Sequence, residues 1–163
     1  MVLTDEQIEQ LIKLPKLVIN PNLKMKLQRS SLQVTYDLRE LNGEREFKLY
    51  LRQNPKDPES YSCGLIYVVD GPDQSVTLCR YNGSNHIHCN SLEDDEPIHF
   101  KCHIHRASER YIALGDKAEK YAETTGRYTT YEGALNCILE DCNISGLEPP
   151  REGPISGEQI SLW

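Results

Sequence analysis

Helical spacing of apolar residues marks the start of the chain. Thr4 and Gln7 have the spacing of a capping box, in which each side chain bonds the other residue's backbone at a helix N-terminus. Apolar side chains then follow on one helical face at Ile8, Leu11 and Ile12. Pro15 ends the pattern, because proline lacks the backbone donor that a helix interior needs. The sequence therefore predicts a short amphipathic helix before Pro15.

Strand-like alternation replaces the helical spacing in the middle of the chain. The segments with alternating or continuously apolar character are residues 31–41, 45–53, 61–70, 74–81, 85–90 and 97–106. The dipeptide Asn42-Gly43 joins the first two and is a strong hairpin signal. Turn residues separate the others, so the pattern predicts a meander of about six strands.

Helical periodicity returns in the last third. Residues 116–125 have the pattern of a short helix that stops at Gly126. Thr130 is a candidate N-cap for a longer amphipathic helix that ends near Asn143. The remaining residues are rich in glycine and proline, which predicts a flexible tail over residues 146–163.

These elements predict one α+β domain over residues 1–145. We expect an N-terminal helix, a curved and mainly antiparallel sheet of about six strands, and a C-terminal helix packed on one face of that sheet. A chain of 163 residues is long enough to bury a substantial core.

All five histidines lie within twenty residues in the middle of the chain. His86 and His88 form one His-x-His pair, His103 and His105 form a second, and His99 lies between them. Residues two apart on a strand share a face. The acidic segment between the pairs predicts a hairpin loop, which would bring both pairs to one sheet face. The strand register decides this, because a slip of one residue sends a whole row to the opposite face.

Basic and aromatic residues flank the histidines. Lys101 shares the predicted face of His103 and His105, and Arg106 follows them. On the preceding strand, Arg80 alternates with Cys79 and Tyr81, so we expect its side chain to join the histidine face.

Composition narrows the functional classes. The net charge is −7 and the sequence pI is about 5.2, which argues against broad binding to a nucleic-acid backbone but not against a small basic site. The N-terminal residues lack the features of a signal peptide, and no segment is long and apolar enough to cross a membrane. Six cysteines without a secretion signal predict reduced thiols and a cytoplasmic location.

Three hypotheses account for the histidines. In the first, His88, His103 and His105 act as acid and base on RNA without a metal. Arg80, Lys101 or Arg106 then holds the phosphate, and Tyr81 or Tyr111 stacks on a base.

In the second hypothesis, zinc is bound by His86, His88, His103 and His105. The chain has no Cys-x-x-Cys knuckle, so the spacing matches no structural zinc motif closely. In the third, the histidines form an inert polar face against a helix or a partner.

The histidine region also carries a family resemblance. Between Arg80 and Ile144, the chain resembles a group of uncharacterised small prokaryotic proteins with an Arg-x-Asp/Asn strand end, a His-x-His strand and a helix ending in Cys-Asn-Ile. It is more distantly similar to TumE-type toxins of toxin–antitoxin pairs, which belong with the RelE/barnase-like ribonuclease folds. The corresponding motifs here are Arg80-Tyr81-Asn82-Gly83, with Asn82 in place of aspartate, and His103-Ile104-His105. This chain departs from those toxins in its greater length, its acidic charge and its second His-x-His pair.

The resemblance implies a toxin-like, defence-related or mobile-element protein that acts on RNA. Our leading hypothesis is a cytosolic, metal-independent ribonuclease without a cofactor. The alternatives are a non-enzymatic phage or mobile-element protein that binds an antitoxin or host factor, and a zinc-stabilised binding module. A shared fold alone does not establish a shared activity.

Overall fold

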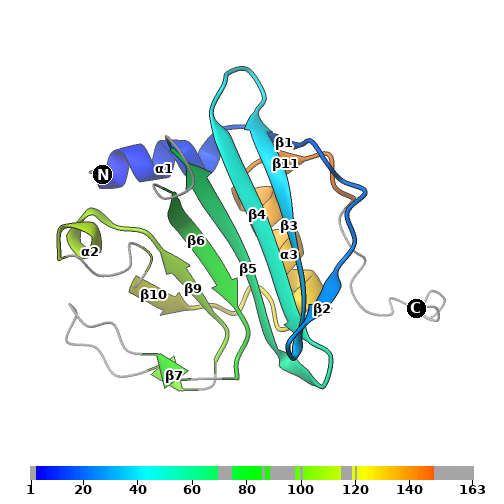
Figure 1. Cartoon of the computed structure of the whole chain (residues 1–163). Coiled ribbons are helices and arrows are strands. Elements are labelled where there is room, and N and C mark those ends of the chain that lie inside the picture. The colour runs from blue at the N-terminus through cyan, green and yellow to red at the C-terminus, as the bar shows by residue number, and fades with distance from the viewer. Residues whose placement is uncertain are drawn as a thin grey trace.

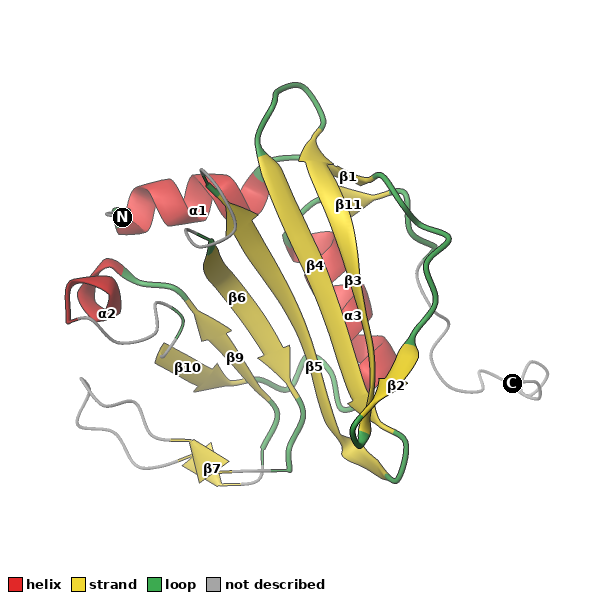
Figure 2. Cartoon of the chain, viewed as in Figure 1, coloured by secondary structure: helices red, strands yellow, loops and turns green. Residues whose placement is uncertain are grey.

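The computed structural model describes residues 3–69, 75–85, 87–88, 98–99, 101–114, 119 and 121–148. Within this part of the chain the fold is α+β, with a large, open and mostly antiparallel sheet (Figures 1 and 2). The helices described are α1 (Asp5–Lys13), α2 (Glu109–Leu114) and α3 (Tyr131–Asp141).

The large sheet has nine strands among the described residues, in the order β10-β9-β6-β5-β4-β3-β1-β11, with β2 also paired to β3. Its central strands are β3 (Ser31–Glu40), β4 (Glu46–Asn54), β5 (Asp57–Val68) and β6 (Val76–Asn82). Its outer strands are β1 (Lys16–Val18), β2 (Lys26–Gln28), β9 (His103–Arg106), β10 (Tyr121–Thr124) and β11 (Ile144–Ser145). All these pairs are antiparallel except that of β1 with β11.

The prediction of about six strands is therefore too low. Strands β1, β2 and β11 are only two or three residues long, so alternation within them is too short to recognise. Strand β10 lies in residues 116–125, which we predicted to be helical, and that prediction is wrong for its four residues.

The N-terminal helix forms as its capping pattern predicts. The backbone N–H of Gln7 donates to Thr4 Oγ1 at 3.1 Å, and the backbone N–H of Thr4 donates to Gln7 Oε1 at 2.9 Å. The apolar stripe of α1 is buried at Ile8, Leu11 and Ile12. The capping box and amphipathic helix are confirmed.

Helix α3 begins at the predicted cap, where the N–H of Gly133 donates to Thr130 Oγ1 at 3.0 Å. The helix contacts β5, β6 and β11, and Figure 2 shows it behind the sheet. The chain then continues into β11, which pairs in parallel with β1. The predicted arrangement, about six strands with a C-terminal helix packed on one face, therefore matches this nine-stranded sheet poorly.

A buried lysine connects the ends of both long helices. Lys16 Nζ donates to the carbonyl oxygens of Ile12 and Leu14, each at 2.7 Å, and to that of Cys142 at 2.9 Å. These carbonyls lie at the C-terminal ends of α1 and α3, where a positive charge is favourable. Burial nevertheless lowers the pKa of Lys16 to about 8.

The segment predicted as one strand over residues 97–106 is divided between two sheets. Ile98–His99 forms β8, which pairs with β7 (Ile87–His88) in a separate two-stranded sheet. His103–Arg106 forms β9 in the large sheet, between β6 and β10. The expected pairing of the two His-x-His strands is wrong, because β9 pairs with β6 and β10 rather than with β7.

Two further expectations concern the chain ends and membranes. Most of the predicted tail, residues 149–163, lies outside the described residues. No helix in the described part of the chain has the length and apolar character needed to cross a membrane.

Candidate functional site

The large sheet has one apolar face and one polar face. In β6, Cys79 and Tyr81 alternate with Arg80 and Asn82. The Sγ atom of Cys79 lies 3.7 Å from that of Cys142, the C-cap of α3, so Cys79 marks the α3 side of the sheet. Arg80 and Asn82 therefore lie on the opposite side.

Strand register carries this polar face across four strands. Paired residues on neighbouring antiparallel strands point to the same side of a sheet. Arg80 pairs with His105 of β9 and with Gly64 of β5, and Gly64 pairs with Tyr50 of β4. The next pairs along these strands are Asn82 with His103, Asn82 with Ser62, and Ser62 with Arg52. We call these residues and Glu119 the polar-face cluster: Tyr50, Arg52, Ser62, Arg80, Asn82, His103, His105 and Glu119.

A cavity of about 360 Å³ opens in this cluster. Its lining residues are Tyr50, Arg52, Ser62, Arg80 and Asn82. Two cationic side chains and several polar groups that can donate hydrogen bonds are the lining that a phosphate group requires. Neither His103 nor His105 belongs to this lining.

Gly64 lets an aromatic ring lie across the sheet at this point. A Cβ atom added at Gly64 would lie 2.1 Å from a ring carbon of Tyr50. The ring of Tyr50 therefore covers the position that any larger residue in β5 would fill. Burial raises the pKa of the Tyr50 hydroxyl, although Arg80 and Ser62 act to lower it, so the phenol stays protonated at neutral pH.

Glu119 connects the cation and one histidine of the cluster. Its carboxylate Oε2 lies 3.0 Å from Arg80 Nη1, and both side chains are largely buried. Its backbone carbonyl lies 2.9 Å from His105 Nδ1. One residue therefore holds both members of the Arg80–His105 pair.

The two histidines of β9 are almost completely enclosed. His103 has 0% of its surface exposed and His105 has 3%, and their ring centroids are 5.0 Å apart. His103 Nδ1 lies 2.8 Å from the carbonyl oxygen of Lys101, as His105 Nδ1 does from Glu119 at 2.9 Å. A carbonyl only accepts, so each Nδ1 carries a proton, and in the neutral form of each ring the lone pair is on Nε2. This is the nitrogen that takes a proton or binds a metal.

The structure brings together three of the predicted site residues, namely Arg80, His103 and His105. Tyr81 and Arg106 lie on the other face, where the Tyr81 hydroxyl donates to Asp141 and Arg106 forms an ion pair with Glu9. Tyr81 is also buried and stacked on Tyr128.

The remaining predicted residues lie elsewhere. Lys101 is exposed and lines a separate cavity of about 500 Å³. His88 belongs to the small sheet with β8, and His86 lies outside the described residues. Strands β7 and β9 are thus in different sheets, so His88 does not share a sheet with His103 and His105. Among the described side chains, no group of three or more His, Cys, Asp or Glu residues is arranged to hold a metal ion.

Sequence reasoning did not propose five members of the cluster as site residues. They are Tyr50, Arg52, Ser62 and Glu119, together with Asn82, which was noted only as a position of the resemblance motif. Alternation around Phe47, Leu49 and Leu51 does place Tyr50 and Arg52 on the face away from the core. It gives no sign that this face adjoins the histidines, because strand order is not visible in a local pattern. Glu119 lies within a segment that we predicted to be helical.

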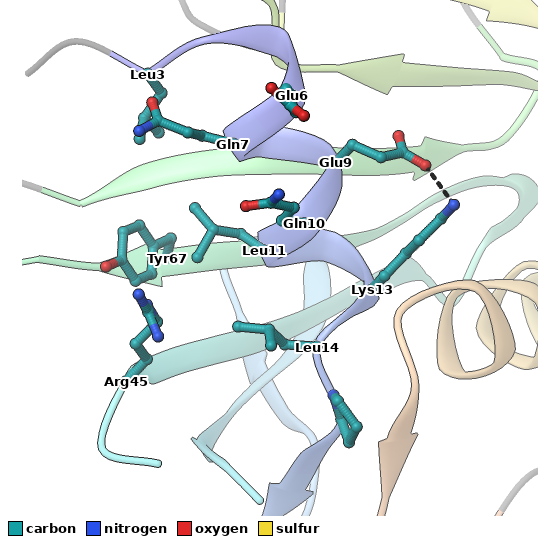
Figure 3. A pocket seen from close by; sticks show the side chains of 11 residues that line it. Leu3, Glu6, Gln7, Glu9, Gln10, Leu11, Lys13, Leu14, Arg45 and Tyr67 are labelled. Atoms are coloured by element: carbon teal, nitrogen blue, oxygen red, sulfur yellow. Dashed lines mark ion pairs between the residues drawn. The ribbon is translucent and has the colours of Figure 1, made fainter. Parts of the chain in front are cut away.

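A larger cavity, of about 780 Å³, lies along α1 (Figure 3). Helix α1 lines it mainly with polar and charged side chains, and Arg45 and Tyr67 line it from the sheet. Within this lining, Glu9 pairs with Lys13 at 2.8 Å. Its lining includes no histidine, so it lacks the imidazole groups of the polar-face cluster.

Comparison with known proteins found no relative from which a function could be inferred. No family model, no curated protein and no solved structure matches the chain.

Proposed function

We propose that the protein is a toxin-like, cytosolic ribonuclease that works without a metal ion, with the polar-face cluster as its active site. The observation that carries this proposal is the pairing of Arg80 with His105 across β6 and β9, with His103 two residues away. RNA cleavage by its own 2′-hydroxyl needs a base, an acid and a cation for the phosphate. The cluster contains candidates for all three.

The proposed roles follow from position and protonation. Arg80 and Arg52 line the cavity and hold the phosphate. His105 takes the proton of the 2′-hydroxyl, whose oxygen bonds to phosphorus. The P–O5′ bond breaks, and the 5′-oxygen takes the phenolic proton of Tyr50. The products are a 2′,3′-cyclic phosphate and a free 5′-hydroxyl.

The burial of His105 restricts the substrate. His105 is buried and does not line the cavity, but its register partner Arg80 does. A nucleotide must therefore enter the cavity as far as Arg80 before its 2′-hydroxyl comes near the imidazole. A base-paired nucleotide is held in its stack, whereas single-stranded RNA presents unstacked nucleotides. The proposed substrate is therefore single-stranded RNA.

The test is cleavage of a single-stranded RNA in the presence of a chelator by wild type, R80Q and K48Q. Lys48 is the matched control, because it is a cation of the large sheet that pairs with Asp37 at 2.7 Å and does not line the cavity. We expect R80Q to lose cleavage and K48Q to retain it. Equal activity in R80Q and wild type would refute the assigned site.

A non-enzymatic interaction protein is the second candidate, favoured by the net charge of −7 and by the enclosure of both histidines of β9. Such a protein, encoded by a phage or mobile element, would bind an antitoxin or host factor. A stoichiometric complex that forms equally with wild type and R80Q, without RNA cleavage by either, would favour this function.

A zinc-stabilised module is the third candidate. Metal-bound histidines commonly donate their second ring N–H to a carbonyl, as Nδ1 of both His103 and His105 does here. Elemental analysis of protein purified without a chelator or affinity tag tests it. About one zinc per chain in wild type, and its loss in H103N, would favour this candidate. Because a structural zinc contributes to the folding free energy, H103N should then also be less stable than wild type.

A further inference from the structure

We infer that the cavity beside Arg80 selects the singly charged phosphodiester within an RNA chain over a doubly charged terminal phosphate, and that Glu119 sets this selectivity. The inference rests on the proposed function in taking RNA as the ligand. It adds a substrate class, internal linkages rather than chain ends, and a positioning residue.

Charge balance around the cavity is the first observation. Arg52 and Arg80 line the cavity, and the carboxylate of Glu119 pairs with Arg80. Two guanidinium groups and one carboxylate together carry a net charge of +1. The other lining residues, Tyr50, Ser62 and Asn82, are neutral and polar. A net charge of +1 is matched by one phosphodiester, whereas a terminal phosphate carries close to two negative charges above its second pKa, about 6.

The burial of Glu119 makes this balance effective. Only 9% of its side-chain surface is exposed, so water screens its carboxylate poorly. A second negative charge bound to Arg80 would therefore repel this carboxylate strongly. An exposed carboxylate at the same distance would have a much smaller effect, because solvent would screen it.

The backbone keeps Glu119 in place. Its carbonyl accepts a hydrogen bond from His105 Nδ1 at 2.9 Å, and His105 is itself enclosed in β9. This contact fixes the backbone of Glu119, and the burial of its side chain limits the freedom of the carboxylate to turn away when an anion enters the cavity. Selectivity thus follows from a fixed charge.

The neutral polar groups support the same choice. Ser62 Oγ donates to Asn82 Oδ1 at 2.6 Å, so the amide oxygen of Asn82 faces Ser62 and its NH₂ group points away from Ser62. This NH₂ group is the donor that Asn82 can offer to a phosphate oxygen. A diester has two unsubstituted oxygens to accept hydrogen bonds, and Arg80 with Arg52 or Asn82 can supply donors to both. The cavity is about 360 Å³, near the lower end of the usual range for ligand sites, which suits one nucleotide unit.

The test is calorimetric titration of wild-type protein at about pH 8 with two ligands, the deoxy dinucleotide TpT and thymidine 3′-monophosphate. TpT contains one phosphodiester, and neither ligand has a 2′-hydroxyl, so binding is measured without cleavage. We expect TpT to bind about tenfold more tightly than the monophosphate, which corresponds to one well-formed charged contact.

Four variants assign the selectivity to named groups. R52Q should weaken both ligands about tenfold, and K48Q should weaken neither. E119Q raises the charge of the site to +2, so it should tighten the monophosphate about tenfold and remove the preference for TpT. E119D keeps the charge and should keep the preference, and it serves as the reference if E119Q folds poorly.

The outcomes separate this inference from the ribonuclease proposal. Tighter binding of the monophosphate than of TpT by wild type would overturn the inference, as would no binding of either ligand. An unchanged preference in E119Q would overturn the role of Glu119. Selective TpT binding together with intact RNA in the cleavage assay would uphold the inference and refute the ribonuclease.

Discussion

Arg80 of β6 and His105 of β9 are direct register partners, so their side chains leave the large sheet on the same face. The two residues are 25 positions apart in the sequence. Each strand contributes a second residue to the polar-face cluster, Asn82 from β6 and His103 from β9. Glu119 contacts both residues, with its carboxylate on Arg80 and its carbonyl on His105. This arrangement fixes a cation beside a defined imidazole tautomer.

RNA cleavage should depend on the planar guanidinium group of Arg80 and not only on its positive charge. In R80K the charge remains, but a lysine cannot offer the planar pair of donors that contacts Glu119 and a phosphate together. We expect RNA cleavage to fall about 100-fold in R80K and about 1,000-fold in R80Q, within the range for loss of one preorganised donor to a reacting charge. Single-turnover kinetics measure both values.

The binding constant for TpT gives the control for these variants. R80K should bind TpT better than R80Q does, because it keeps a cation in the cavity. Identical cleavage rates in R80K and wild type would show that the planar donor pair has no part in the reaction.

His105 should supply a base that asparagine cannot replace. In H105N the amide group can still donate to the carbonyl of Glu119, so the local hydrogen bond survives while the proton acceptor is lost. We expect cleavage to fall about 100-fold or more, as for loss of a general base. The pH–rate profile of H105N should also lose its acidic limb.

H103N is the companion variant, because His103 makes the same kind of contact with the carbonyl of Lys101. Thermal unfolding must show that both variants are folded at the assay temperature. A wild-type pH–rate profile in folded H105N would contradict the role of His105 as base.

Gly64 should be needed for the position of Tyr50. The Cβ atom of G64A would lie 2.1 Å from the Tyr50 ring, so the ring must move away from Ser62 and Arg80. We expect unfolding free energy to fall by about 1–3 kcal/mol, as in other overpacked sites. The RNA cleavage rate of folded G64A should also be lower than that of folded wild type, because Tyr50 is the proposed acid.

G126A is a matched control for this substitution, since no atom lies within 4 Å of the position of its added Cβ. Urea unfolding and RNA cleavage measure the two effects. Equal results for G64A and G126A would mean that the close approach of Tyr50 to β5 is unimportant.

Lys16 should make stability depend on pH. Burial lowers its pKa to about 8 from the usual 10.5. Between these values the unfolded state binds more protons than the native state, so the contribution of Lys16 to stability rises with pH. Below about pH 8 the cost of burying the charge is present in full. Urea unfolding at about pH 7.5 and about pH 9.5 should show wild type gaining stability relative to K16M as pH rises.

K13M provides the reference for an exposed lysine, since Lys13 is exposed and pairs with Glu9 on the surface of α1. A difference between K16M and wild type that is the same at both pH values would contradict the lowered pKa of Lys16.

Local sequence patterns correctly predicted the hairpin turn and the helix caps, which are formed by residues close in sequence. The hairpin signal at Asn42-Gly43 lies between β3 and β4, whose bounds agree with the predicted strands within one residue. The capping residues Thr4 and Thr130 also begin helices as expected. In each case, the turn or cap is formed by residues close in sequence, so the physical cause is visible in the sequence itself.

Strand order and strand breaks were not accessible in the same way. The alternation from Ile98 to Arg106 continues through a point where the chain changes from one sheet to another. The site depends on which strands pair with β6, and that is decided by long-range packing. Arg80, His103 and His105 were identified by residue type and periodicity. Glu119 was missed because it lies in a segment that we predicted to be helical, and its contact with Arg80 is long-range.

The most direct test of the account is mass spectrometry of the ends produced from a single-stranded RNA by wild type and R80Q, in the presence of EDTA. The account predicts 2′,3′-cyclic phosphate and 5′-hydroxyl ends with wild type only. An RNA with one 2′-deoxy nucleotide should remain intact at that nucleotide. No cleavage by wild type, or cleavage at the deoxy position, would contradict the assignment of the polar-face cluster as a metal-independent ribonuclease site.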